Sequence, residues 1–236
     1  MVYETIVGRT KEDLEKFGNK VCGYIGKHIV GTGEDAHLTT PVKIDLLKPH
    51  VILIAGKRGS GKSYSAGTIL EEILSLEKPY AEKTSAVIFD PVGIYWSMKN
   101  PNEQQRELLS KWKLEPKGFP NIKVYVPLEL EETYEKAGIP VDFAISISPK
   151  EFSPSDWTLA FNLEPTSEFA VSLERIINIF LEEDFDFSID DIITKIKDDG
   201  QSSQHTKNIL ISNFEVAKGW GIFSQHGMNI DNIVKP

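Results

Sequence analysis

The apolar positions of the chain follow two kinds of pattern. Short apolar runs at 51–55, 85–90 and 122–126 lack polar alternation, and a less regular one covers 141–147. Unbroken runs of this length are typical of strands that are covered on both faces, as in a parallel sheet. Helical spacing of apolar residues separates these runs, so the pattern predicts an α/β fold with a mainly parallel sheet.

Helical spacing dominates the second half of the chain. Ser153 with Asp156 and Ser188 with Asp191 have the spacing of capping boxes, which start helices. The predicted helices cover 153–161, 167–182, 188–198 and about 205–218. Residues 151–219 are therefore expected to form a helical insertion packed on the sheet.

The first 48 residues differ from the rest. Strands are predicted at 21–25 and 42–47, and Thr10 with Asp13 predicts a short helix through Lys16. We expect residues 1–48 to form a small β-rich segment, followed by a nucleotide-binding core over 49–236.

Composition narrows the class of protein. The chain has 236 residues, of which 40% are hydrophobic and 26% charged, as in a soluble globular protein. It has no apolar run long enough for a membrane span and no secretory signal, so the expected location is the cytoplasm, with no membrane partner. The net charge of −9 argues against a generally basic surface that coats nucleic acid, but it leaves room for local positive loops.

The run at 51–55 leads directly into a glycine-rich loop. Residues 56–63 match the spacing G-x-x-x-x-G-K-S of a phosphate-binding P-loop, and a helix is predicted over 64–76. Glycines let backbone amides approach an anion, Lys62 supplies charge to the β- and γ-phosphates, and Ser63 ligates Mg²⁺. The helix dipole favours the same anion. The residues expected to bind ATP are Gly56, Gly59, Ser60, Gly61, Lys62, Ser63 and Tyr64.

Two acidic segments are candidates for the catalytic acid that hydrolysis requires. Asp90 ends the run at 85–90, and the carboxyl ends of parallel strands face the ligand crevice. Asp90 is therefore a candidate catalytic residue, in addition to Lys62. An equally good interpretation is that Asp90 only starts a turn. The second segment, 176–184, also ends in acids, but its helical spacing favours the end of a helix.

Residues 50–64 and 87–95 resemble the HerA/FtsK-like P-loop ATPases, ring-forming DNA translocases common in archaea. The second stretch is similar to the D-P-x-G-E-Y segment of that family, with Ile94 in place of the glutamate. The resemblance spans about residues 40–236, including a tail from Trp220 to Pro236. It implies a RecA-like core in a hexameric ring that couples ATP hydrolysis to movement along double-stranded DNA, a small N-terminal β-barrel and a nuclease as a frequent partner.

The leading hypothesis is therefore the ATP-binding portion of a HerA-like DNA-translocating ATPase or helicase. The Walker B strand, the sensor residue and the arginine finger of the family would lie beyond Pro236, so weak or no hydrolysis is expected from these residues alone. One alternative is a nucleotide-binding assembly or regulatory module without significant hydrolysis. Another is a small-molecule kinase with Asp90 as base or metal ligand, which the presence of only four arginines disfavours.

Overall fold

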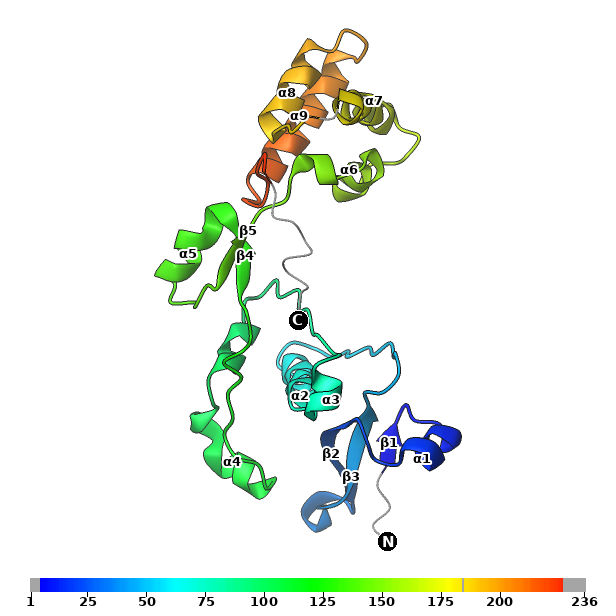
Figure 1. The fold of residues 1–236 in the computed structure, drawn as a ribbon, viewed down its shortest axis with the longest axis vertical. Coiled ribbons are helices and arrows are strands. Elements are labelled where there is room, and N and C mark those ends of the chain that lie inside the picture. The colour runs from blue at the N-terminus through cyan, green and yellow to red at the C-terminus, as the bar shows by residue number, and fades with distance from the viewer. Residues whose placement is uncertain (1–4, 184, 227–236) are drawn as a thin grey trace. The chain divides into compact units, whose positions relative to one another are not determined.

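The computed structural model describes residues 5–183 and 185–226 (Figure 1). The chain divides between residues 121 and 122 into two compact units.

The first unit begins with a three-stranded sheet of order β1-β3-β2, formed by β1 (Thr5–Val7), β2 (Cys22–Val30) and β3 (His37–Asp45). β2 and β3 are antiparallel, with the turn η1 (Gly33–Asp35) between them, and β1 is parallel to β3. Helix α1 (Lys11–Phe17) is capped by Thr10, whose hydroxyl accepts a hydrogen bond from the Asp13 amide. Both predicted strands and the predicted helix are present, and each strand is longer than expected.

The glycine-rich loop and its helix follow this sheet. The helix predicted over 64–76 is α2 (Lys62–Leu74), and it begins two residues earlier than expected. After it come α3 (Lys78–Ala81), η2 (Tyr95–Lys99), η3 (Glu103–Gln105) and α4 (Arg106–Lys111).

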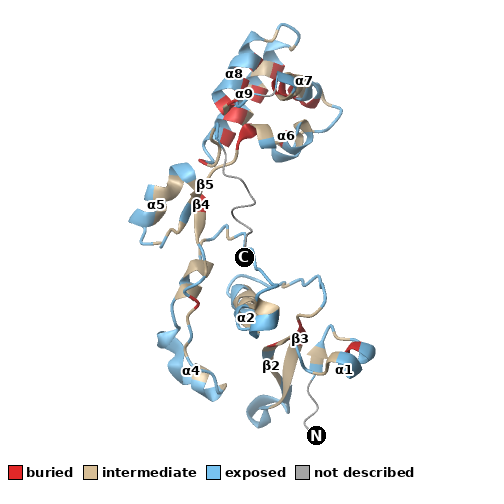
Figure 2. Cartoon of the chain, in the orientation of Figure 1, coloured by how far each residue is buried: buried red, intermediate tan, exposed pale blue. Residues whose placement is uncertain are grey.

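The strands predicted at 51–55 and 85–90 are not formed, so this part of the prediction is wrong for this structure. Both segments lack regular secondary structure. Leu53 is 88% exposed and Phe89 is 91% exposed, and both segments are mostly exposed in Figure 2. A strand requires a neighbour for its backbone hydrogen bonds, and no described strand pairs with either segment.

The second unit contains a small parallel sheet. Strand β4 (Tyr125–Pro127) pairs with β5 (Phe143–Ile145), and η4 (Leu128–Leu130) and α5 (Glu131–Lys136) make the crossover. The strands predicted at 122–126 and 141–147 are thus confirmed in shorter form. Beyond β5, Ile147 forms a parallel bridge with Phe223, where the Ile147 amide donates to the Ile222 carbonyl over 2.8 Å.

The helical part of the second unit holds most of the buried core. After η5 (Pro149–Glu151) come α6 (Pro154–Ala160), α7 (Glu168–Glu183), α8 (Ile189–Asp198) and α9 (Gln204–Lys218), so all four predicted helices are confirmed. Both predicted capping boxes are formed. Figure 2 shows buried residues gathered in α7, α8 and α9. The fully buried side chains include Trp157, Leu173, Ile177, Ile192, Ile196, Leu210 and Phe214.

Together these elements are a mixed α/β arrangement, as predicted, but the parallel sheet is too small to identify a RecA-like core. The acidic segment at 176–184 belongs to α7 as far as Glu183, and Ile176 and Ile177 are buried there, as its helical spacing indicates. The tail at 230–236 lies outside the described residues. Within the described ranges, no helix has the length and apolar character needed to cross a membrane.

Candidate functional site

The loop before α2 has the backbone conformation that its glycines allow. The Ser60 amide donates to the Lys57 carbonyl over 3.2 Å, which closes a turn. Gly59 and Gly61 have φ angles of +79° and +87°, and no atom lies within 4 Å of the position that a Cβ would occupy at either residue. Positive φ, and not crowding, therefore explains glycine at these two positions.

Gly56 is required for a different reason. A Cβ at this residue would overlap the Ser60 hydroxyl. A larger residue at position 56 would therefore require the Ser60 side chain to rotate or move.

Lys62 and Ser63 form the start of α2. The Lys62 ammonium donates to the Lys57 carbonyl over 2.9 Å, so its side chain folds back over the loop. The first amides of a helix have no intrahelical acceptor and point outward, and the helix dipole adds positive potential there. With Lys57, Arg58 and Lys62 in the same eight residues, the arrangement suits a phosphate group.

The residues of the loop could hold a magnesium ion only together with a bound nucleotide. In the described part of the chain, no group of three or more His, Cys, Asp or Glu side chains could hold a metal ion. Mg²⁺ prefers oxygen ligands and is often held by one or two protein groups together with substrate phosphates. Ser63, in the first turn of α2, can supply one such oxygen, so a magnesium ion fits here if a nucleotide brings it.

Asp90 has turn-forming contacts. Its carboxylate accepts the backbone amides of Gly93 at 2.9 Å, Ile94 at 2.6 Å and Tyr95 at 2.8 Å, at the start of η2. The Tyr95 hydroxyl donates to the Ser63 carbonyl over 3.5 Å, so the turn lies beside the first turn of α2. A direct role for Asp90 at a bound nucleotide stays a prediction.

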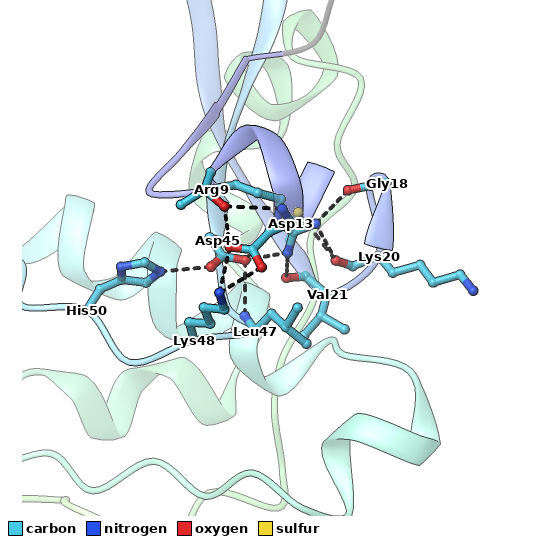
Figure 3. A network of polar contacts seen from close by, with 11 residues as sticks. Arg9, Asp13, Gly18, Lys20, Val21, Asp45, Leu47, Lys48 and His50 are labelled. Carbon is cyan, nitrogen blue, oxygen red and sulfur yellow. Dashed lines mark hydrogen bonds and ion pairs between the residues drawn. The ribbon is translucent and has the colours of Figure 1, made fainter. Parts of the chain in front are cut away.

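A polar network joins the N-terminal sheet to His50, which lies six residues before Gly56 (Figure 3). The Arg9 guanidinium pairs with the Asp45 carboxylate and donates to the carbonyls of Gly18 at 2.6 Å and Lys20 at 2.9 Å. His50 Nε2 lies 2.9 Å from Asp45 Oδ2. Burial favours a raised pKa for Asp45, but hydrogen bonds from Arg9 and His50 outweigh it, so its pKa is below the usual value.

Sequence reasoning missed two contacts of this region. Neither the contact of His50 with Asp45 nor that of Glu72 with β2 is indicated by the sequence pattern. Glu72 accepts the Tyr24 amide of β2 over 2.8 Å. No periodicity signals such contacts, because each joins residues of different elements.

Comparison with known proteins matches a family model to most of the chain. The family model described as the central domain of the helicase HerA matches residues 23–230. No curated protein and no solved structure matches the chain significantly. The matched range includes the loop, α2, the Asp90 turn and the helices α5 to α9 of the second unit.

Proposed function

Because the chain belongs to the HerA family of HerA/FtsK-type P-loop ATPases, we propose that it binds Mg-ATP through residues 56–64. In this proposal the backbone amides of Gly59, Ser60 and Gly61 surround the phosphates. Lys62 leaves the Lys57 carbonyl to contact the β- and γ-phosphates, and Ser63 ligates magnesium. Magnesium would neutralise phosphate charge in the bound nucleotide.

One observation supports the proposal: the backbone conformation of the loop is the one that its glycine spacing predicts. Its two left-handed glycines and its tight turn precede the first turn of α2 without a break. A preformed loop spends less conformational entropy on binding than a disordered one.

The wider proposal is that the chain forms the ATP-binding portion of a DNA translocase. The family match supports a RecA-like P-loop core in this proposal. A hexameric ring, double-stranded DNA as partner and a nuclease companion are proposed from the family resemblance alone.

A second candidate, nucleotide binding without significant turnover, is favoured by the contacts of Asp90. Its carboxylate already accepts three backbone amides, so using it to hold a magnesium shell or to position water would disrupt the turn before η2. Phosphate release measured with and without double-stranded DNA separates the two functions. DNA-stimulated release favours the translocase, and ATP-dependent assembly without release favours the binding module.

Titration with a fluorescent ATP analogue in the presence of magnesium tests the site itself. Lys62→Ala removes a charged donor to the phosphates, so affinity should fall by about 10- to 100-fold. Lys83→Ala, which removes an exposed lysine outside the loop, is the matched control and should bind like the wild type. Equal affinity of Lys62→Ala and wild type would refute the assignment.

A further inference from the structure

The P-loop lies between two attachments to the same N-terminal sheet. The first precedes the loop at His50, and the second follows it at Glu72, in the last turn of α2. Both contacts lie within the first unit. They matter because the segment that leads into the loop, 51–55, has no strand partner among the described residues.

The first attachment fixes the chain where it leaves β3. The His50 ring contacts Asp45, the last residue of β3, which is held in turn by Arg9 (Figure 3). Asp45 also accepts the Leu47 amide over 3.2 Å, which orders the intervening turn. The ring packs closely on Gly8, where a Cβ would lie 2.9 Å from His50 Cε1. His50 is therefore held by a charge-assisted hydrogen bond and by shape.

The second attachment joins the last turn of α2 to β2. Glu72 accepts the Tyr24 amide, and a Cβ at Gly23 would lie 2.7 Å from Glu72 Cβ. The glycine thus lets α2 approach the strand closely enough for the hydrogen bond. Since Gly23 is not at positive φ, this close approach is the reason for glycine here.

We propose that His50 and Glu72 are positioning residues that hold the segment from 50 to 72, which contains the P-loop, on the N-terminal sheet and thereby set its affinity for nucleotide. The inference rests on the proposed function, because it assumes that the loop binds phosphate. A loop held at both ends samples fewer arrangements, and apparent affinity scales with the fraction of molecules in the competent arrangement. The N-terminal sheet would then control the nucleotide site without touching the nucleotide.

The test uses the whole chain with four variants. His50→Ala and Glu72→Ala remove the attachments, while His50→Gln keeps a side-chain N–H donor and Glu72→Gln keeps an acceptor oxygen. His37→Ala, at the exposed end of β3, is the control. Affinity for a fluorescent ATP analogue should fall about three- to tenfold in each alanine variant and return to within about twofold of wild type in each glutamine variant.

A second readout needs no nucleotide. Trypsin cleaves after Lys57 and Arg58, so the cleavage rate at these residues, followed by mass spectrometry, reports how firmly the loop is held. Both alanine variants should be cleaved several-fold faster there than wild type and the His37→Ala control. Faster cleavage in these variants supports the attachments even if no variant binds nucleotide, in which case only the proposed function fails.

Two results would overturn the inference. One is that His50→Ala and Glu72→Ala keep both wild-type affinity and wild-type cleavage at Lys57 and Arg58. The other is that the glutamine variants lose as much affinity as the alanine variants, together with an equal fall in Tm. In that case the contacts stabilise the sheet as a whole and do not position the loop.

Discussion

The P-loop region of the first unit and the helices of the second unit are both rich in apolar residues, but only the helices bury them. Leu53, before the P-loop, is 88% exposed, whereas Leu173 in α7 is fully buried. Helix α2 is intermediate, because its apolar positions such as Ile69 and Ile73 are half-buried. The difference follows whether an element packs against neighbours, as α7, α8 and α9 do, and not the hydrophobicity of the sequence.

The comparison shows how far local sequence can direct structure. A helix satisfies its backbone hydrogen bonds within one segment, and α7, α8 and α9 then pack against one another. A central strand depends on neighbours on both sides. Residues 51–55 and 85–90 have strand-like composition, but their hydrogen-bond partners must come from other segments.

The largest fall in the free energy of unfolding is expected from a substitution in the helical core. Trp157→Ala removes a fully buried indole that packs against Phe152, Phe161 and Phe214, so the free energy of unfolding should fall by about 3–5 kcal/mol. Leu159→Ala, in the same helix but 81% exposed, should change it by less than about 0.5 kcal/mol. Urea unfolding followed by circular dichroism measures both, and similar losses would contradict the burial described.

A smaller loss of stability is expected at the ion pair between Arg175 and Asp199. Arg175 Nη1 donates to Asp199 Oδ1 over 2.8 Å, and Arg175 Nη2 donates to Asp199 Oδ2 over 2.7 Å. Arg175→Met should lower the free energy of unfolding by about 1.5–3 kcal/mol at pH 7. Hydrogen bonds from Arg175 are the main cause that holds the pKa of Asp199 well below its usual value.

The sign of the pH dependence follows from that shift. A depressed carboxylate pKa stabilises the folded state fully above the unfolded value of about 3.9, and this stabilisation is lost as the pH falls through the folded pKa. Between pH 7 and pH 2, wild type should therefore lose more stability than Arg175→Met. If the free energy of unfolding fell by the same amount in both proteins between pH 7 and pH 2, this role of Asp199 would be contradicted.

The smallest change in the free energy of unfolding is expected from a substitution in the segment before the P-loop. Leu53→Ala should change the free energy of unfolding by less than about 0.5 kcal/mol, because the side chain is exposed. A loss of more than about 2 kcal/mol would show that residues 51–55 are buried in solution, and it would remove the contrast between the two regions.

The parts of the fold and of the candidate site that could be predicted from the sequence are those held by contacts within one segment. Capping residues such as Ser153 and Ser188 marked helix starts correctly, since the cap is a contact within four residues. Glycine spacing likewise predicted the turn before α2. The contacts of Asp90 were left open by the sequence, because a strand-ending carboxylate can either accept nearby amides or face a ligand. The link from Glu72 to Tyr24 spans 48 residues and has no local signal.

The bridge between Ile147 and Phe223 has a consequence for the evolution of the chain. The Ile147 amide donates to Ile222 over 2.8 Å, and the Ser224 amide donates back to the Ile147 carbonyl over 3.1 Å. The segment from 148 to 221 thus leaves and re-enters the structure at adjacent backbone positions, as interchangeable inserted domains do. The two hydrogen bonds hold the ends of this segment together, so the length of its helices can change without altering the pairing of β4 with β5.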